Sequence, residues 1–424
     1  MHRPRAVVVV TGSELVRGSR RDLNGPFLAS DLLRLGVDPA RIVLVGDRPD
    51  ELEDAIREAV GADICLTSGG LGPTHDDRTL ELLARVLGRP LRLDPGLERE
   101  IEAVSRSIAA RLDRPYADFV HGVRKQASVP EGGEVIGLAG TAPGVLIEHD
   151  GSVAVALPGP PAELRRLWPA ALAAAPFQRI LSRTRPPGHR VLRFFGPSES
   201  AIATVLDEIG GEGGGVEVTV CARELEIHVD LYADDGGAPK VEALERALLD
   251  GFGGMLFAED ERSIEEIVLA LCRARGLTLA TAESCTGGMV GERLTGIAGS
   301  SDVYLGGVVV YANSAKASLL GVPAEVLEHH GAVSAESAAA MATGARAAFG
   351  ANVAASVTGI AGPGGGTPEK PVGLVFAHVE TPDGSAGRRL DLPGDRESIR
   401  TRATAIVLHL LRDALSPQSR DSPV

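Results

Sequence analysis

Aromatic and sulfur-containing side chains are scarce in this chain of 424 residues. Phe, Trp and Tyr make up 3% of the sequence, so the hydrophobic cores must consist mainly of Val, Leu, Ile and Ala. The only cysteines are Cys65, Cys221, Cys272 and Cys285. Because they are widely spaced and form no C-x-x-C pair, we expect neither a zinc site nor a disulfide framework, and a reducing cytoplasm fits the composition.

Positive charge is also in deficit, since the formal net charge is −14. Nonspecific binding to nucleic acid depends on clustered Lys and Arg that neutralise phosphates, so the composition argues against it. The first apolar run, Ala6–Val10, is too short for a secretion signal or a membrane span. We therefore expect a cytoplasmic protein with neither nucleic acid nor membrane as a partner.

Strand-like and helix-like segments alternate along the N-terminal part. Short β-branched runs predict strands, and apolar residues at helical spacing follow each of them, in the order Ala6–Thr11, Asn24–Leu35, Ile42–Val45, Asp50–Val60, Ile64–Thr67 and Thr79–Leu87. Residues 93–123 look helical throughout. The alternation predicts an α/β fold with a doubly wound, mostly parallel sheet, in which ligands bind at the carboxyl ends of the strands.

The length of the chain predicts two or three domains. We expect an N-terminal nucleotide-binding domain at 1–172, a small α/β connecting domain at 173–257, a C-terminal α/β domain at 258–415 and a disordered tail at 416–424. The sequence Ser263-Ile-Glu-Glu266 is a capping box that opens a helix of the C-terminal domain, and Gly276 is placed to close it.

The segment Thr281–Gly288 reads as the end of a strand, a tight Gly-rich loop and the start of a helix. Such a loop can present a nucleophile beside backbone N–H groups, and here the nucleophile is Ser284, with Cys285 as the rival. We rank Cys285 second because the residue next to Ser284 should point toward the core. A serine needs a base, and Lys316 can act as one if apolar surroundings lower its basicity. Glu283 either orients this lysine or caps the helix.

A second Gly-rich loop, Ser68–Asp77, also follows a predicted strand and precedes a helix. Its glycines and the helix dipole suit a phosphate, whereas Asp76 and Asp77 would repel one. A divalent cation that bridges the carboxylates and the phosphates would remove this conflict. The loop therefore predicts a nucleotide site that depends on a metal.

Three C-terminal segments together resemble the nicotinamide mononucleotide (NMN) deamidase domain of the CinA family: Thr281–Gly288, Tyr311–Lys316 and Thr358–Gly366. The resemblance implies an amidohydrolase that needs no cofactor and uses Ser284 and Lys316, with Tyr311 nearby. The N–H groups of Thr286, Gly287 and Gly288 would stabilise an oxyanion or a phosphate, which adds Thr286 to the catalytic residues. The remaining substrate contacts that we expect are Glu283, Gly287, Gly288, Asn313, Thr358, Gly359, Gly362, Gly365 and Arg396.

The N-terminal segments resemble the molybdopterin-binding fold shared by the MogA and MoaB proteins and the CinA N-terminal domain. This resemblance implies ADP-ribose binding or metal-dependent ADP-ribose pyrophosphatase activity, with Asp76 and Asp77 as metal ligands. The expected nucleotide contacts are Glu14, Asn24, Ser68, Gly69, Gly70, Gly72, Thr74 and Glu163. Two positions depart from the family pattern, which often has Asp or Thr where Ser13 stands and Asn where Gly137 stands.

The main expectation is therefore a homodimeric enzyme of pyridine-nucleotide recycling whose partners are NMN and ADP-ribose. Two alternatives remain open from the sequence. One is a molybdopterin-handling protein, which the N-terminal fold alone suggests. The other is a nonenzymatic regulatory protein in DNA uptake or the damage response, which the family name suggests.

Overall fold

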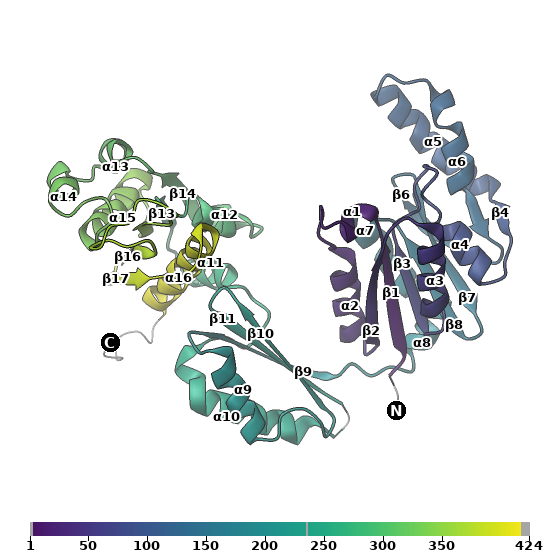
Figure 1. Cartoon of the computed structure of the whole chain (residues 1–424), viewed down its shortest axis with the longest axis horizontal. Helices are drawn as coiled ribbons and strands as arrows, with labels where there is room; N and C mark the ends of the chain where they lie inside the picture. The colour runs from purple at the N-terminus through teal and green to yellow at the C-terminus, as the bar shows by residue number, and fades with distance from the viewer. Residues whose placement is uncertain (1–2, 235, 417–424) are drawn as a thin grey trace. The chain divides into compact units, whose positions relative to one another are not determined.

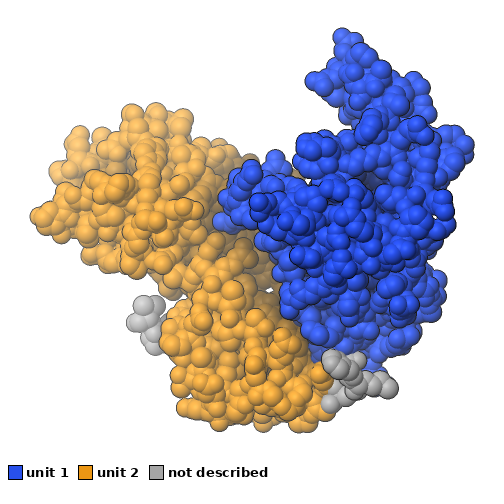
Figure 2. All heavy atoms as spheres, turned by 45° about the vertical axis from the view of Figure 1, so that its right-hand side comes forward, with its two compact units in different colours: residues 1–187 blue, residues 188–424 orange. Residues whose placement is uncertain are grey.

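The computed structural model describes residues 3–234 and 236–416, and the chain divides into two compact units (Figures 1 and 2). These units are Met1–Pro187 and Gly188–Val424. Except for Ser416, the tail predicted to be disordered lies outside the described residues. Among the described residues no helix is both long and apolar enough to cross a membrane.

Unit 1 contains a six-stranded sheet with the order β2-β1-β3-β8-β7-β6 (Figure 1). Four parallel strands form one side and two antiparallel strands the other, and their bounds are β1 Arg5–Thr11, β2 Asp38–Val45, β3 Ile64–Ser68, β8 Ser152–Leu157, β7 Ala142–His149 and β6 Glu134–Ala139. The predicted α/β class and the mostly parallel sheet are confirmed. The antiparallel strands β6 and β7 are absent from the sequence prediction, because their glycines obscure the strand pattern.

Helices cover both faces of this sheet, since alternate residues of each strand point to opposite sides. Val8 of β1 belongs to a core with α2 (Asn24–Arg34), α7 (Pro161–Ala173) and α8 (Ala175–Leu181). The next residue, Val9, belongs to a second core, whose helices are α3 (Pro49–Ala59), α4 (Thr79–Val86), α5 (Pro95–Arg111) and α6 (Val120–Gln126). Burial on two faces explains the continuous apolar run of β1.

Residues 93–123, predicted to be helical, form two α-helices separated by a break. Helix α5 ends at Arg111, a short 3₁₀ turn occupies Tyr116–Asp118, and α6 begins at Val120. Asp113 has a positive φ of 52° and is followed by Arg114 and Pro115. Because a left-handed residue and a proline both interrupt the helical hydrogen-bond pattern, the helix divides here. A short ribbon of β4 (Leu91–Leu93) and β5 (Ser128–Pro130) flanks this segment.

Unit 2 begins with a four-stranded antiparallel sheet of order β10-β11-β9-β12. Its strands and two helices are β9 Gly188–Phe195, α9 Glu199–Glu208, β10 Val216–Arg223, β11 Glu226–Ala233, α10 Ala238–Phe252 and β12 Leu256–Ala258. The two helices pack on one face of the sheet and enclose a core that includes Leu192, Phe194 and Leu244. The segment 210–215, predicted to be a flexible turn, joins α9 to β10.

The second part of unit 2 is a five-stranded sheet of order β14-β13-β15-β16-β17. Its first three strands are parallel, and its elements are α11 Ile264–Ala274, β13 Leu279–Glu283, α12 Met289–Thr295, β14 Tyr304–Val309, α13 Asn313–Leu320, α14 Ala324–His329, α15 Ala335–Phe349, β15 Val353–Gly359, β16 Leu374–Thr381, β17 Gly384–Asp391 and α16 Arg396–Leu415. One core lies between the sheet and α11, α12 and α16, and another between the sheet and α13 and α15.

The helix boundaries around α11 follow the sequence prediction closely. The Ser263 hydroxyl accepts from the Glu266 N–H, and the Glu266 carboxylate accepts from the Ser263 N–H, so the capping box is confirmed. Gly276 has a φ of +62° after the end of α11, as a C-terminal cap requires. Strand β14, by contrast, ends at Val309 instead of the predicted Tyr311.

Candidate active site

The loop between β13 and α12 holds the candidate nucleophile at the carboxyl end of a parallel strand. Ser284 continues the sheet, because its N–H donates to the Val357 carbonyl oxygen at 3.0 Å. Gly287 and Gly288 then take positive φ values of 64° and 102°, which a residue with a side chain would adopt only with strain. The two glycines turn the chain sharply into α12 and leave Ser284 largely buried, with 7% of its surface exposed.

Lys316 lies in the second turn of α13, where its amine faces the serine. Nζ is 3.1 Å from Ser284 Oγ, 2.7 Å from the Val310 carbonyl oxygen and 3.5 Å from that of Tyr311. The side chain is 1% exposed, and burial lowers its pKa from the usual 10.5. A neutral amine has two N–H groups, and these can donate hydrogen bonds to the two carbonyl oxygens. Its lone pair can then accept a hydrogen bond from the serine hydroxyl.

The rival nucleophile is in a different environment. Cys285 is 4% exposed and belongs to the core between the sheet and α16, as predicted for the residue next to Ser284. Burial raises the pKa of its thiol to about 12, and nearby N–H groups of Cys285 and Thr286 only partly oppose this rise. Because the thiolate is the reactive form, the structure favours Ser284 over Cys285 as the nucleophile.

Glu283 caps the Ser284 loop, and its hydrogen bonds among the described residues do not include Lys316. Its carboxylate accepts from the Thr286 hydroxyl at 2.7 Å and from the N–H groups of Gly288, Val290 and Gly291 at 2.9, 3.1 and 2.8 Å. Of the two roles left open by the sequence, the structure therefore selects the cap.

The same contacts correct the expected oxyanion donors. The Gly288 N–H is already bonded to Glu283, and the Gly287 N–H donates to the Ser284 carbonyl oxygen at 3.1 Å. Thr286 is fully buried, and its hydroxyl also donates to Glu283. Two of the three N–H groups that we expected to face a substrate, those of Gly287 and Gly288, therefore hold the loop in its shape.

Two arginines one turn apart on α16 connect the loops around Ser284. Arg396 donates to the Gly362 carbonyl oxygen and to the Tyr311 hydroxyl, both at 2.8 Å. Arg400 donates to the carbonyl oxygens of Cys285 at 3.1 Å and Thr286 at 2.8 Å. The sequence analysis missed Arg400, although its spacing of four from Arg396 places both side chains on one helix face.

A cavity of about 560 Å³ adjoins this arginine pair. Its lining consists of Met289 at the start of α12 and five residues at the start of α16, namely Asp395, Arg396, Glu397, Arg400 and Thr401. Tyr311 is 61% exposed, and Asn313 and Gly365 are exposed as well. These three predicted residues therefore remain accessible to a ligand.

Thr358 and Gly359 differ from the expectation that they contact substrate. The Thr358 hydroxyl is buried and donates to the Ala332 carbonyl oxygen at 2.7 Å, so it fixes the loop before α15. At Gly359 a Cβ atom would lie 2.6 Å from a Val375 methyl group and 2.8 Å from the Leu374 carbonyl oxygen. This glycine is required for close packing of β15 against β16.

In unit 1 the carboxyl ends of β3 and β8 are joined by buried polar groups. The Asn24 amide donates to Ser68 Oγ at 2.9 Å and to the Gly159 carbonyl oxygen at 2.7 Å. Ser68 Oγ in turn donates to the Pro158 carbonyl oxygen at 3.2 Å. Gly69 packs so tightly on β1 that a Cβ atom would lie 2.5 Å from the Thr11 carbonyl oxygen. Asn24 and Ser68, both predicted to bind a nucleotide, are thus satisfied within the protein.

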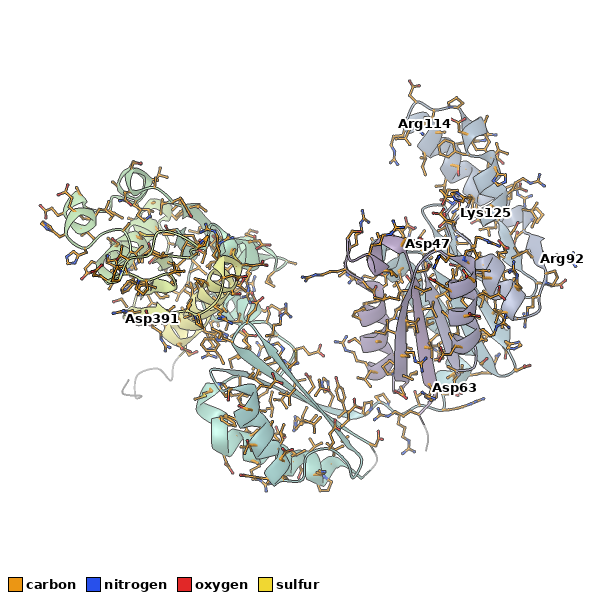
Figure 3. All side chains as sticks on the ribbon, in the orientation of Figure 1. Asp47, Asp63, Arg92, Arg114, Lys125 and Asp391 are labelled. Atoms are coloured by element: carbon orange, nitrogen blue, oxygen red, sulfur yellow. The ribbon has the colours of Figure 1, made fainter. Side chains whose placement is uncertain are left out.

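The C-terminal part of the Ser68–Asp77 loop is exposed and carries charged side chains. Thr74 contacts both candidate metal ligands: its hydroxyl donates to Asp76 and lies 2.5 Å from Asp77, and its N–H donates to Asp77 at 2.9 Å. Hydrogen bonding from Thr74 lowers the pKa of the Asp76 carboxyl. Lys125 of α6, labelled in Figure 3, donates to the Thr74 carbonyl oxygen and stands beside these carboxylates. A protein cation, absent from the sequence prediction, therefore already balances part of their charge.

Other predicted N-terminal residues lie around the same end of the sheet. Glu14 is exposed on the short helix α1 (Ser13–Val16), and Glu163 is half-buried in the first turn of α7. Burial raises the pKa of Glu163. Asp47, also labelled in Figure 3, accepts from the Thr11 hydroxyl at 3.1 Å and the Ser13 N–H at 2.9 Å, so it fixes the loop after β1.

These features define the class of the protein: it has an N-terminal molybdopterin-binding-like domain and a C-terminal α/β domain with a buried serine–lysine pair. Residues 7–176 match the model of a probable molybdopterin binding domain, and residues 261–415 match the model of the CinA C-terminal domain. A CinA-like protein of Mycolicibacterium gilvum is 46% identical over 419 residues, which cover 97% of this chain and 99% of the relative.

A CinA-like protein of Mycobacterium tuberculosis is 43% identical over 422 residues, or 97% of each chain. A solved structure of the competence/damage inducible protein CihA from Agrobacterium tumefaciens is 42% identical over 38% of this chain and 99% of that chain, with a TM-score of 0.35. The identity and coverage of the full-length relatives show that the chain belongs to the CinA family.

Proposed function

We propose that the C-terminal domain hydrolyses the carboxamide of NMN and releases nicotinic acid mononucleotide and ammonia. The observation that carries this proposal is the buried Lys316 amine 3.1 Å from the buried Ser284 hydroxyl. A serine attacks an amide only when a base takes its proton, and burial prepares this lysine to do so at moderate pH. Membership of the CinA family supports the choice of an amide substrate.

The reaction follows from the positions of these two groups. Lys316 takes the Ser284 proton as Oγ attacks the carboxamide carbon. The protonated Lys316 side chain then gives a proton to the leaving nitrogen, which departs as ammonia. A water molecule then attacks the acyl-serine ester and gives its proton to Lys316, and Ser284 leaves with a proton from the same amine. Over the whole reaction a carbon–oxygen bond to water replaces the carbon–nitrogen bond, so water is the only reactant besides NMN.

The arginine pair on α16 provides a place for the ribose phosphate of NMN. Arg396 and Arg400 line a cavity of about 560 Å³, a volume within the usual range of small-molecule sites. Guanidinium groups bind phosphate through paired, charge-assisted hydrogen bonds. In this arrangement the phosphate is held by α16 while the carboxamide approaches Ser284 at the end of β13.

Exchange of the two adjacent candidate nucleophiles tests the proposal directly. We expect Ser284→Ala to lower NMN-dependent ammonia release by at least about three orders of magnitude, since covalent catalysis is lost. The matched variant Cys285→Ala should keep most of the activity, because the thiol is buried and protonated. Both purified proteins should retain the wild-type circular dichroism spectrum.

The opposite pattern, with Cys285→Ala inactive and Ser284→Ala active, would overturn the assignment of the nucleophile. No ammonia release from wild-type protein would overturn the deamidase proposal and favour one of the two alternatives, a molybdopterin-handling or a nonenzymatic regulatory protein. Ammonia release thus separates the deamidase reading from the other two.

For the N-terminal domain we propose binding of ADP-ribose, with metal-dependent hydrolysis of its pyrophosphate. The support is the Gly-rich loop at the carboxyl end of β3 beside the carboxylates of Asp76 and Asp77. Their hard oxygen atoms fit a divalent cation, although no group of three or more candidate ligands occurs among the described residues. Mg²⁺ is often held by one or two carboxylates together with substrate phosphates, so this donor set fits a cation that binds with the nucleotide. When bound, such a cation would polarise a phosphoryl oxygen.

Neutralisation of the two carboxylates tests the metal requirement. Isothermal titration calorimetry of wild-type protein should detect ADP-ribose binding with Mg²⁺ and little binding with a chelator. The double variant Asp76→Asn and Asp77→Asn should lose this dependence on Mg²⁺ and any hydrolysis, because its loop no longer repels phosphate. Its NMN deamidation should remain unchanged. Tight binding of ADP-ribose by wild-type protein in the presence of chelator would refute the bridging cation and assign charge balance to Lys125.

A further inference from the structure

A second cavity in unit 2 lies where the β10–β11 hairpin and the start of α9 meet β17 and α16. Its volume is about 540 Å³, which suits a small molecule of nucleotide size. Three guanidinium groups from three different elements line it: Arg223 on β10, Arg388 on β17 and Arg402 on α16. Apolar wall is provided by Phe195, Leu225, Leu390 and Ile406.

The cavity is lined by three arginines and three glutamates, and none of these glutamates forms an ion pair with one of these arginines among the described residues. Arg388 has a single long contact, 3.9 Å, with Asp413, and Arg402 donates to the Pro393 carbonyl oxygen. Within the described part of the chain Arg223 has no recorded ion pair. None of the three guanidinium groups has a carboxylate within 3.5 Å among the described residues, although Arg402 adds to the effect of the Ser398 hydrogen bonds in lowering the pKa of Asp395. Such a cluster is suited to a dianionic ligand.

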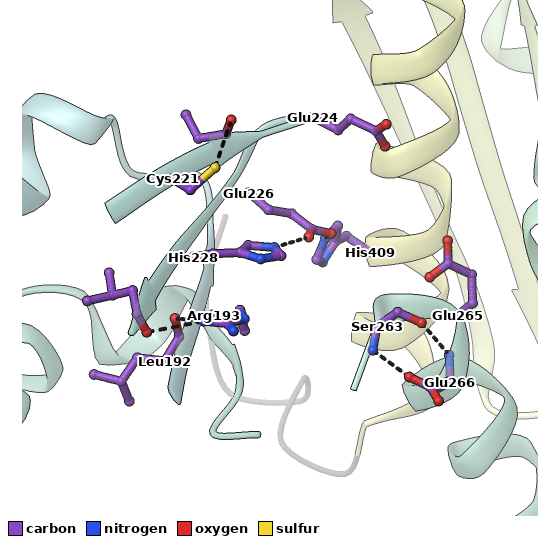
Figure 4. Close-up of polar contacts among 12 residues, drawn as sticks. Leu192, Arg193, Cys221, Glu224, Glu226, His228, Ser263, Glu265, Glu266 and His409 are labelled. Atoms are coloured by element: carbon purple, nitrogen blue, oxygen red, sulfur yellow. Dashed lines mark hydrogen bonds and ion pairs between the residues drawn. The ribbon is translucent and has the colours of Figure 1, made fainter. Parts of the chain in front are cut away.

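Two of the three acidic residues of the cavity are already engaged elsewhere. Glu224 accepts from Arg293 at 2.9 Å. Glu226 accepts from His228 at 2.9 Å and from His409 of α16 at 2.8 Å (Figure 4). Burial tends to raise the pKa of Glu226, but hydrogen bonds and charge from both histidines outweigh it and lower the pKa to about 2. These contacts fasten the hairpin to the C-terminal domain.

The hairpin tip at the cavity has an unfavourable backbone conformation. Glu224 and Leu225 have positive φ values of 51° and 73°, although neither is a glycine. Two-residue hairpins of this type strongly favour Asn-Gly, so Glu224 and Leu225 hold this conformation at a cost. The tip keeps its shape because Arg293 holds Glu224, while Leu225 forms part of the cavity wall. Strain of this kind gathers at ligand sites.

We propose that this cavity is a regulatory site for a nucleoside monophosphate. Arg223, Arg388 and Arg402 would bind the phosphate, since guanidinium groups recognise it in pairs. Glu199, at the start of α9, is exposed and has no ion-pair partner within the described part of the chain. Its carboxylate would accept hydrogen bonds from the ribose hydroxyls. The base would lie against Leu225 and the other apolar wall residues.

Two connections lead from this cavity to the Ser284 loop. Arg293, which holds the hairpin tip, belongs to α12, the helix that starts directly after that loop. Arg402 lies on α16 beyond Arg400, which holds the Cys285 and Thr286 carbonyls. A ligand that draws the hairpin and α16 together therefore acts on both supports of the loop. The effect of this ligand on catalysis rests on the proposed deamidase function, whereas the binding of the ligand does not.

Calorimetric titration of the full chain with adenosine monophosphate tests the site. Arg223→Ser removes one guanidinium group from the exposed hairpin, and we expect it to weaken binding about tenfold to a hundredfold. Adenosine, which lacks the phosphate, should bind wild-type protein at least about tenfold more weakly than the monophosphate. The matched control is Arg246→Ser on α10, an exposed arginine of the same sheet domain that does not line the cavity.

Hydrogen exchange provides a second readout that does not depend on enzyme activity. Adenosine monophosphate should slow amide exchange in the hairpin 216–233 and in α12 of wild-type and Arg246→Ser protein, and not in Arg223→Ser. If adenosine monophosphate also binds at other sites, that binding would persist in Arg223→Ser. Only the binding that this variant loses is therefore assigned to the cavity. Absence of binding, equal loss in both variants, or equal affinity for adenosine would overturn the proposal. If NMN deamidation is absent but these results hold, the cavity site stands and the proposed function fails.

Discussion

The two Gly-rich loops of this protein start from the same local design and place their serines in different chemical surroundings. Each starts with a buried serine at the end of a parallel strand and leads to a helix: Ser68 is the last residue of β3, and Ser284 directly follows β13. Ser284 Oγ faces the Lys316 amine, which can accept a proton. Ser68 Oγ faces the Asn24 amide and a carbonyl, neither of which can act as a base. The partner supplied by the rest of the fold decides whether such a serine can react.

The charges of the two loops differ in the same way. Glu283 accepts four hydrogen bonds from its own loop and the first turn of α12, so its carboxylate stabilises the local backbone. Asp76 and Asp77 are bonded mainly to Thr74 and remain at the surface with Lys125 beside them. The first loop is buried and internally hydrogen-bonded. The second presents carboxylates to solvent, where a hydrated cation and a phosphate can meet.

Removal of the base is expected to have the largest effect on this contrast. Lys316→Met should lower NMN turnover by about two to four orders of magnitude, because Ser284 would keep its proton. Since burial lowers the Lys316 pKa, the activity of wild-type protein should rise with pH through that lowered pKa, and this limb should vanish in the variant. Turnover measured as ammonia release from pH 6 to 10 gives both results. Near-normal turnover in Lys316→Met would contradict the assignment of Lys316 as the base for Ser284.

The same pKa shift has a consequence for stability. In wild-type protein the unfolded chain binds more protons than the folded one between the lowered pKa and 10.5, so the free energy of unfolding should rise with pH in that window. Lys316→Met should lose this contribution. Urea unfolding of both proteins at several pH values measures the difference.

Loosening the support of the catalytic loop should have an intermediate effect. Arg400→Met removes the guanidinium that holds the Cys285 and Thr286 carbonyls, and a shift of the nucleophile by about 1 Å lowers turnover about a hundredfold. If Arg400 acts only by positioning, kcat should fall while the pH profile of Lys316 stays unchanged. Arg246→Met, an exposed arginine on α10 that lines neither cavity, is the control. A variant with normal kcat and a raised KM would instead assign Arg400 to substrate phosphate.

The smallest change is expected at the unreactive serine. Ser68→Ala leaves the Asn24 amide one acceptor short, and we expect a loss of about 1–3 kcal/mol in the stability of unit 1 with no effect on NMN deamidation. Ser19→Ala, which removes an exposed hydroxyl, should change stability by less than about 0.5 kcal/mol. Thermal unfolding compares the two. Equal stability of both variants would mean that Ser68 does not support the loop.

Local pattern was a good guide wherever a single face or cap decided the structure. The capping box at Ser263, the strand–loop–helix at Thr281–Gly288 and the buried strand β1 all depend on near neighbours in the chain. Strand β17 was missed because it is mostly exposed and carries Arg388 and Arg389, so only pairing with β16 makes it a strand. The helical character predicted for 93–123 is present, but the break at Asp113 was not foreseen because helical spacing continues across it.

For the candidate sites, the sequence by itself determined which loops carry reactive groups and which glycines turn them. Tertiary structure alone decided what those groups meet. Lys316 comes within 3.1 Å of Ser284, 32 residues away, because β13 and β14 are parallel neighbours and α13 starts at their shared carboxyl end. Arg400 reaches the same loop from 115 residues away because α16 packs across α12. Such contacts depend on the order of strands in a sheet, which no local pattern encodes.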